Sequence, residues 1–164
     1  MLKGIGIQDL PDNVPVSLKN RNELITLMPN SPTISGLTNS SYAYVKDAYG
    51  RIIEENISFE IFVLDMLPKL DFESVLAHEY LHVWLYMNKL DYGSTTSEGF
   101  CNIAKALIYE DKGGKFSEIQ LKKMNDDPDP NYGRGYRIMK KCLDYYGWKK
   151  FIKMINNNQA SYCY

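Results

Sequence analysis

Apolar and polar positions follow a different pattern in each half of the chain. The first half alternates short β-prone runs with turn residues, whereas the second half contains longer runs without such breaks. Residues 24–28 are apolar and β-branched, and the turn-forming residues 29–32 follow them. This pattern predicts a strand at 24–28 that ends at the turn.

A hairpin is predicted around Asp47-Ala48-Tyr49-Gly50, because the β-prone residues 42–46 and 52–56 flank this turn-like sequence. Residues 57–64 alternate between apolar and polar side chains and then become wholly apolar. We expect them to form a further strand that is exposed at one end and buried at the other.

The second half predicts helices. Asp71 is a good N-cap residue for a long run free of glycine and proline, and Ser117 is expected to cap a short helix. The glycines at 113 and 114 are typical of a helix end and turn. The predicted helices cover residues 72–88, about 96–109, a short segment from 117, 132–146 and 148–155.

These elements predict an α+β fold in one domain, with a sheet-rich part over residues 1–66 and a helical part over 67–164. A chain of 164 residues has the size of one compact domain. We expect a small mixed or antiparallel sheet that packs on the first long helix, followed by the helical half.

Charge and cysteine pattern narrow the classes of protein. The net charge is −1 and the lysines are dispersed, which excludes the basic stripe of a nucleic-acid binder. Residues 1–6 lack the apolar run of a signal peptide, and no apolar run is long enough to span a membrane. Cys101, Cys142 and Cys163 are odd in number and widely spaced, so we expect no disulfide framework and no cysteine zinc site. A reducing, cytoplasmic location is therefore predicted.

Both histidines of the chain lie in one segment, His78-Glu79-Tyr80-Leu81-His82, on the first predicted long helix. This is the H-E-x-x-H pattern with which zinc peptidases hold a metal and a base on one helix. At about 100° per residue, the two imidazoles point the same way. Two core histidines brought together by chance are the alternative interpretation.

A catalytic zinc needs a third protein ligand and a fourth position for water. Because no histidine remains, the third ligand must be a carboxylate or a thiolate, and the downstream candidates are Asp91, Glu98, Cys101 and Glu110. We select Glu98, because it opens the second helix after a short return loop. Asn102, one turn later on the same face, is expected to hydrogen-bond a ligating ring or carboxylate. A capping box with Thr95 is the alternative role for Glu98.

Glu79 is the expected general base. Zinc lowers the pKa of a bound water to about 7, and the side chain of Glu79 lies about 60° around the helix from that of His82, within reach of such a water. The oxyanion that forms from the amide needs a hydrogen-bond donor, and a tyrosine hydroxyl is a common one. Composition alone does not select among 13 tyrosines.

Three segments together resemble a known family. They are Leu67–Leu85 with the H-E-x-x-H motif, Glu98-Gly99-Phe100-Cys101-Asn102, and Tyr132-Gly133-Arg134-Gly135-Tyr136-Arg137. Their order and spacing resemble those in the peptidase domain of the plant DA-one family. The members of this family are LIM-linked, ubiquitin-regulated zinc peptidases. The resemblance covers residues 57–155 and implies a zincin-like fold and a gluzincin site with Zn²⁺ held by His78, His82 and Glu98. Ser97 and Asn102 depart from the family pattern without removing a ligand.

The third segment also resembles the Tyr-x-x-Gly-aromatic motif of zinc aminopeptidases, in which the tyrosine steadies the transition state. This resemblance implies that role for Tyr132, with Tyr136 as the fallback. It carries over the chemistry only, because the regulatory modules of the plant proteins have no counterpart in these residues.

The leading hypothesis is therefore a zinc metallopeptidase that acts on polypeptides, with the strand at 57–64 offering its edge to an extended peptide. The alternative for that strand is an ordinary core strand. Alternative functions are a catalytically silent or latent zincin-fold binding module and an aminopeptidase or small-amide hydrolase. No nucleic-acid or membrane partner is expected, and protein regulators stay open. The acidic, proline-rich loop before Tyr132 is a hypothetical lid.

Overall fold

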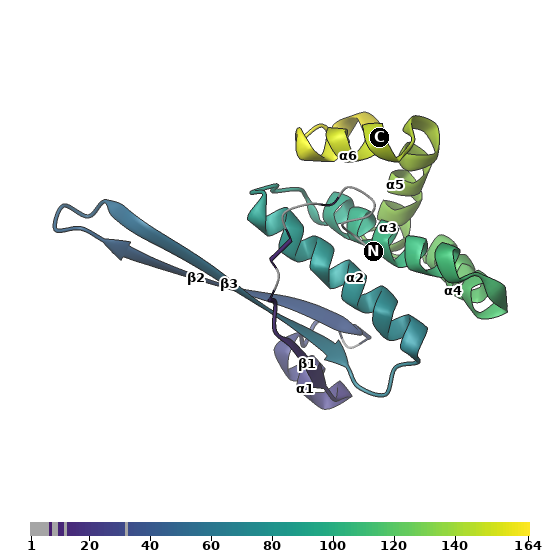
Figure 1. Ribbon diagram of the computed structural model, residues 1–164. Coiled ribbons are helices and arrows are strands. Elements are labelled where there is room, and N and C mark those ends of the chain that lie inside the picture. Colours follow the sequence, from purple (N-terminus) through teal and green to yellow (C-terminus); the bar gives the residue numbers. More distant parts are fainter. Residues whose placement is uncertain (1–6, 8–9, 12, 32) are drawn as a thin grey trace. The chain divides into compact units, whose positions relative to one another are not determined.

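Three strands and six α-helices make up the described part of the chain, in the order β1, α1, β2, β3, α2 to α6, followed by the 3-10 helix η2 (Figure 1). The computed structural model describes residues 7, 10–11, 13–31 and 33–164. Residues 1–6 and Pro32, used above for the signal-peptide and turn expectations, lie outside them. The α+β class is confirmed. The elements are β1 Val16–Lys19, α1 Arg21–Leu27, β2 Gly36–Lys46, β3 Ile52–Leu64, α2 Lys69–Met87, α3 Ser94–Lys112, α4 Gly114–Asp126, α5 Gly133–Tyr146, α6 Trp148–Asn156 and η2 Ala160–Cys163.

The chain divides into two compact units. One is the sheet unit, residues 11–66, and the other is the helical unit, which holds residues 67–164 and the described part of 1–10. The boundary at 66/67 is where the sequence predicts the change from sheet to helix. No helix among the described residues is long and apolar enough to cross a membrane.

The sheet has the strand order β1-β3-β2 and is mixed, as the sequence allowed. β1 pairs in parallel with β3, with Val16 opposite Ile61, and β2 pairs antiparallel with β3, with Tyr42 opposite Ile57. Over residues 61–64, β3 is therefore a central strand with neighbours on both sides. The expectation that residues 57–64 offer a free edge is wrong for 61–64, because β1 occupies that edge.

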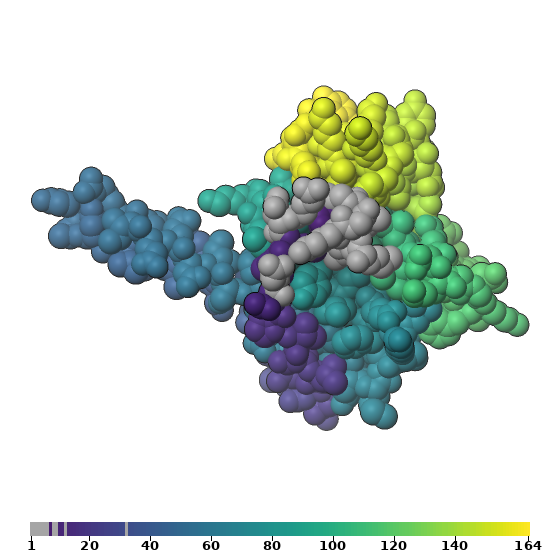
Figure 2. Space-filling view, in the orientation of Figure 1, coloured from purple at the N-terminus to yellow at the C-terminus, as the bar shows by residue number. Residues whose placement is uncertain are grey.

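The predicted hairpin is confirmed, but the strand after its turn runs without a break from Ile52 to Leu64. The carboxylate of Asp47 organises the turn by accepting hydrogen bonds from the backbone N–H groups of Tyr49 and Arg51 and from the Arg51 side chain. Gly50 adopts φ +79°, which few residues other than glycine tolerate. Near the turn, the side chains of residues 39–46 in β2 and 52–58 in β3, here called the distal part of the hairpin, are exposed. No other segment of the sheet unit covers them on the face shown in Figure 2.

The strand predicted at 24–28 is wrong, because these residues lie in helix α1 or at its end. Asn20 and Glu23 form a capping box, in which the Asn20 side chain accepts from the Glu23 N–H and the Glu23 carboxylate accepts from the Asn20 N–H. This reciprocal cap satisfies two backbone donors of the first turn and outweighs the β propensity of the apolar residues.

The helical unit is built around α2 and α3, which are longer than predicted. α2 begins after Pro68 and has no side-chain cap, so the expectation that Asp71 caps it is wrong. Asp71 lies in the first turn and accepts a 2.6 Å hydrogen bond from the Tyr109 hydroxyl of α3. Ser117 is likewise not a cap, since α4 begins at Gly114 and Ser117 is buried within it.

The core of this unit contains side chains from α2, α3, α5 and α6. Trp84, Phe100 and Phe151 form an aromatic row through it, with ring centroids 5.7 and 6.0 Å apart. The helices predicted at 132–146 and 148–155 are confirmed as α5 and α6 within one residue at each end. They meet at Gly147, whose φ of +73° permits the sharp change of direction.

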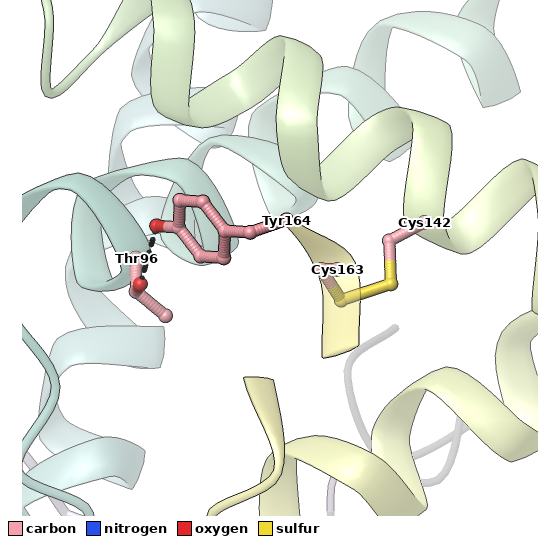
Figure 3. Close-up of a disulfide and its surroundings, with 4 residues drawn as sticks. All are labelled: Thr96, Cys142, Cys163 and Tyr164. Carbon is pink, nitrogen blue, oxygen red and sulfur yellow. Dashed lines mark hydrogen bonds between the residues drawn. A yellow bond between two sulfur atoms is a disulfide. The ribbon is translucent and has the colours of Figure 1, made fainter. Parts of the chain in front are cut away.

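The expectation that the cysteines form no disulfide is wrong. Cys142 of α5 and Cys163 of η2 are joined by a disulfide, although they are 21 residues apart in the sequence (Figure 3). The fold brings their Cα atoms to 5.1 Å. Spacing in the sequence did not reveal this pair because the chain must pass through α6 before Cys163 returns to α5.

Candidate metal centre

Helix α2 presents His78 and His82 one turn apart, with both imidazoles directed to the same point. Their Nε2 atoms are 3.2 Å apart and their ring centroids are 4.9 Å apart. His78 is 6 % exposed, so its ring is held within the helical unit and away from bulk solvent. The predicted common direction of the two rings follows from their spacing of four residues on a helix.

Helix α3 adds Glu98 to the two histidines. Its Oε2 atom lies 3.1 Å from Nε2 of His78 and 3.5 Å from Nε2 of His82. A capping box with Thr95 does not occur, because α3 begins after Gly93 without a side-chain cap and Thr95 donates its hydroxyl to Asn131. The carboxylate of Glu98 is therefore directed at the imidazoles and is not used to cap its own helix.

The protonation of these groups is strongly coupled. Burial opposes the charged form of Glu98, but hydrogen bonds from His78 and His82 outweigh it and lower the pKa of Glu98 to about 2. Burial lowers the pKa of His78 despite the nearby carboxylate. Burial also opposes protonation of His82, but Cys101 and Glu98 outweigh it and raise the pKa of His82. The Glu98 carboxylate is thus ionised at neutral pH, and of the two imidazoles that of His82 is protonated more readily.

The distances fit a divalent cation. In a tetrahedral site with ligand distances of about 2.0 Å, neighbouring ligand atoms lie about 3.3 Å apart. The three separations among Nε2 of His78, Nε2 of His82 and Oε2 of Glu98 are 3.1, 3.2 and 3.5 Å. Two imidazole nitrogens and one carboxylate oxygen form a donor set that suits zinc.

One feature departs from the usual surroundings of a metal site. Nδ1 of His78 is buried and has no hydrogen-bond partner among the described residues, whereas a ligating imidazole usually donates this N–H to an acceptor. The orientation of the His78 ring therefore depends on packing and on the 3.1 Å contact of its Nε2 atom with Glu98. The Tyr132 ring contributes to it, stacked at 18° with a centroid distance of 6.4 Å.

Cys101, one of the four downstream candidates for the third ligand, lies in the same cluster. It is fully buried on α3, one turn after Glu98, and the sulfur and one ring nitrogen of each histidine all lie within 4.8 Å of one another. Burial raises the pKa of the Cys101 thiol, partly offset by His82. The helical spacing of Glu98 and Cys101 was the signal for this position, since residues three apart share a face.

The other two candidates for the third ligand lie elsewhere. Glu110 is at the far end of α3, where its carboxylate is 3.6 Å from the Lys140 ammonium. Asp91 is exposed in the loop between α2 and α3. Among the described residues, the side chains whose ligand atoms all lie within 4.8 Å of one another are His78, His82 and Cys101, so neither Asp91 nor Glu110 is one of them. Glu98 is not one of them either, and its candidacy rests on its 3.1 and 3.5 Å distances to the two imidazoles.

Glu79 and Lys105 bring further charge to the cluster. Glu79 follows His78 on α2 and is 6 % exposed, and its charge acts on both His78 and Cys101. Lys105 lies two turns after Glu98 on α3. Burial lowers the pKa of Lys105, and among the carboxylates that oppose this effect Glu79 is the strongest. Sequence reasoning did not identify Lys105, although its spacing of seven from Glu98 places both on one helix face.

Tyr132 reaches the cluster from the start of α5. Burial, together with the charges of Glu98 and Glu79 and a hydrogen bond to Glu98, raises the pKa of Tyr132 well above its ordinary value. Tyr136, the fallback residue, is one turn further along α5 and is 4 % exposed. Burial raises the pKa of Tyr136, and the charged groups that act on it are Glu110, Lys140 and Asp144. Tyr132, whose ring stacks on that of His78, is therefore the tyrosine at the histidines.

Glycines allow α3 and α5 to approach closely enough for this. A Cβ atom on Gly99 would lie 2.4 Å from the Gly135 carbonyl, and one on Gly135 would lie 2.3 Å from the Thr95 carbonyl. At Gly133 a Cβ atom would lie 2.0 Å from the Asp127 carbonyl. The glycines beside Glu98 and after Tyr132 therefore have a packing role, because any side chain there would separate the two segments.

The loop before Tyr132 is tied down by hydrogen bonds. Oδ1 of Asp129 accepts from the N–H groups of Asn131 and Tyr132, and Arg137 donates to the carbonyls of Asn125 and Asp127. These bonds hold the loop without a ligand, so the structure gives no support to the hypothetical lid.

Asn102 takes part in holding the same loop. Its side-chain amide donates to the Tyr132 carbonyl at 3.2 Å. The expected bond from Asn102 to a ligating side chain is not the one observed. Asn102 therefore positions Tyr132 and does not orient a candidate metal ligand directly.

Comparison with known proteins does not assign the chain to a family. A scan against protein-family models found no match, and searches of curated proteins and of solved structures found none either.

Proposed function

We propose that this protein is a zinc-dependent metallopeptidase with a zincin-type fold, in which His78, His82 and Glu98 hold the metal. The observation that supports the proposal most directly is the convergence of three ligand atoms from two helices at separations of 3.1 to 3.5 Å. A divalent cation would offset the cost of keeping an ionised carboxylate and two imidazoles together in a buried place.

Zinc bound there would supply an acidified water and an electrophilic centre for a peptide carbonyl. Glu79 is the general base of the proposal. It is buried beside His78, where a carboxylate can accept a proton from the attacking water and return it to the leaving amine. A glutamate that follows a ligating histidine lies too far around the helix to compete as a ligand.

Tyr132 is the proposed donor to the developing oxyanion. A tyrosine hydroxyl with its ordinary pKa of about 10 is protonated at neutral pH, and burial and nearby carboxylates raise the pKa of Tyr132 further. A neutral phenol held beside Glu98 can donate a hydrogen bond to an oxygen that gains negative charge during attack. The stack of its ring on His78 and the Asn102 bond to its carbonyl fix its position before substrate binds.

The proposed substrate is a polypeptide. An unfolded protein or peptide library, incubated with the zinc-loaded chain, tests the activity, and blocking the N-termini of the peptides separates an endopeptidase from an aminopeptidase. Glu79→Gln should lower the rate at least 100-fold, the scale of general base catalysis, and still bind zinc. Glu118→Gln, at an exposed site on α4, is the matched control and should retain full activity. Equal rates for both variants would remove Glu79 from the mechanism.

A second function is favoured by Cys101. If its thiolate joined His78, His82 and Glu98 around the metal, four protein ligands would close the coordination shell and the protein would be a catalytically silent or latent metal-binding module. Cobalt substitution distinguishes the two, because a cobalt–thiolate bond gives an intense charge-transfer absorption in the near ultraviolet.

For the peptidase, the cobalt-loaded chain should lack this absorption and Cys101→Ser should bind cobalt unchanged. A strong absorption that disappears in Cys101→Ser would establish the closed site instead. Cys142 and Cys163 do not interfere, because their sulfurs are joined to each other.

The cellular compartment of the protein is linked to the redox state of Cys142 and Cys163. Disulfides persist in oxidising compartments and are rare in the cytoplasm. The cytoplasmic location expected from the sequence therefore requires Cys142 and Cys163 to be reduced, whereas the disulfide favours an oxidising compartment. Rapid alkylation of thiols in intact cells, followed by mass measurement of the chain, decides between them.

A further inference from the structure

We propose that Tyr164, held in place by the Cys142–Cys163 disulfide, is a positioning residue for Glu98 and that reduction of the disulfide weakens metal binding. The inference rests on the proposed role of Glu98 as a metal ligand. Figure 3 shows the two features that carry it: the disulfide from α5 to η2, and the neighbouring Tyr164 side chain reaching Thr96 at the start of α3.

The contact with α3 is specific. The hydroxyls of Tyr164 and Thr96 share a 2.7 Å hydrogen bond, and Thr96 is 8 % exposed. Thr96 lies in the first turn of α3, two residues before Glu98. A displacement of this turn would therefore move the carboxylate that faces both histidines.

The first turn of α3 depends on such contacts because it lacks a cap of its own. Gly93 is the N-cap residue and supplies no side-chain hydrogen bond. Three side-chain bonds hold the turn instead: Thr95 donates to Asn131 in the loop before Tyr132, Thr96 is bonded to Tyr164, and Ser97 donates to the Tyr92 carbonyl. Uncapped first turns fray readily, so each of these bonds contributes to fixing Glu98.

The disulfide adds a covalent restraint on Tyr164, a largely exposed side chain, to the core packing of Ala160 in the same segment. It closes a loop of 21 residues between α5 and η2. Without it, the segment around Cys163 regains conformational freedom and Tyr164 spends less time on Thr96.

The redox step is a thiol–disulfide exchange with a cellular dithiol. Two electrons and two protons pass to the Cys142–Cys163 bond, which becomes two thiols, while the dithiol becomes a disulfide. Oxidation by the reverse exchange restores the restraint. The proposed site would thus bind its metal more tightly in an oxidising compartment than in a reducing one.

The test measures the affinity of the full chain for Zn²⁺ alone, by competition with a chromophoric chelator. Tyr164→Phe removes one hydroxyl and keeps the disulfide, and it should weaken Zn²⁺ binding about fivefold, the effect of one net hydrogen bond. Tyr162→Phe is the matched control, since Tyr162 is exposed on the same segment, and it should bind as the unaltered chain does. Thr96→Val should weaken Zn²⁺ binding as much as Tyr164→Phe does. Thr96→Ser keeps the hydroxyl and should bind Zn²⁺ as the unaltered chain does.

The role of the disulfide is tested with the double variant Cys142→Ser, Cys163→Ser, which has no released thiols to bind zinc. It should bind Zn²⁺ more weakly than the unaltered chain but no more weakly than Tyr164→Phe, and the chain with all three substitutions should bind like Tyr164→Phe alone, because both changes act through one contact. Unchanged affinity in Tyr164→Phe or in the double variant would overturn the proposal. So would an independent, multiplicative effect of the two changes.

Amide hydrogen exchange provides a readout that does not need the metal. Tyr164→Phe should speed exchange at residues 96–100, relative to Tyr162→Phe, in the metal-free chain. If the unaltered chain binds no zinc, the proposed function fails, and the exchange result then decides the positioning role by itself. Equal exchange in the two variants would reject that role.

Discussion

At the scale of single residues, the most informative group is the Glu98 carboxylate. Two imidazoles within 3.5 Å lower its pKa from 4.5 to about 2, against the opposing effect of burial. A carboxylate whose pKa is lower in the folded state stabilises the fold above its unfolded pKa. This stabilisation is lost as the pH falls towards the folded value.

Glu98 therefore predicts an acid-sensitive contribution to stability in the metal-free protein. Between about pH 5 and pH 3, the free energy of unfolding should fall by on the order of 2 kcal/mol more for the unaltered chain than for Glu98→Gln. Urea unfolding at a series of pH values measures both. If the two stabilities decline in parallel over this range, the imidazoles do not stabilise the ionised carboxylate.

At the scale of elements, the crossing of α3 and α5 determines the candidate site. Gly99 and Gly135 place the two helix starts in backbone contact, and this brings Tyr132 beside Glu98 and His78. The segments around Glu98 and Tyr132 thus contain glycines needed for packing as well as chemical groups. Glycine is required at the crossing because of the close approach, not because of its backbone freedom.

Gly135→Ala tests this crossing. The new Cβ atom would lie 2.3 Å from the Thr95 carbonyl, so the helices must separate, at a cost of about 1–3 kcal/mol in unfolding free energy. Gly93→Ala, where a Cβ atom meets nothing within 4 Å, should cost less than about 1 kcal/mol. Chemical denaturation of both variants gives the comparison. Similar small losses at the two positions would show that the crossing tolerates a side chain.

At the scale of the whole molecule, all candidate ligands belong to the helical unit. His78, His82, Glu98 and Cys101 come from α2 and α3, while the sheet unit supplies none of the described metal-binding candidates. A metal that binds only the folded state stabilises that state by mass action. The stabilisation by the metal should therefore be largest in α2 and α3, which carry the candidate ligands.

Zinc should slow amide exchange in α2 and α3 much more than in the distal part of the β2–β3 hairpin. With free Zn²⁺ at about 100 times its Kd, the expected stabilisation is about 2.7 kcal/mol. Hydrogen exchange followed by mass spectrometry of peptides resolves the two units. His82→Ala should abolish the protection, and protection that survives in this variant would place the metal elsewhere.

The sequence alone determined the features that depend on neighbours along the chain. Four-residue spacing on a helix directs His78 and His82 to one point, and β-prone runs around Asp47–Gly50 form the hairpin, because these interactions are local. α1 was missed because a cap made by Asn20 and Glu23 outweighs β propensity, and this competition is not visible from apolar character alone.

Tertiary structure alone decided which distant side chains meet. Cys142 meets Cys163 because the helices cross in one particular arrangement, which composition and spacing do not encode. Helical spacing places Cys101 on the same face as Glu98, but only the packing of α2 against α3 brings that face to the histidines. Asn102 contacts the Tyr132 carbonyl for the same reason. Contacts between residues far apart in the chain depend on how helices cross, and the crossing depends on how their whole faces pack. The lack of a Cβ atom at Gly99 and Gly135 is enough to decide one such crossing.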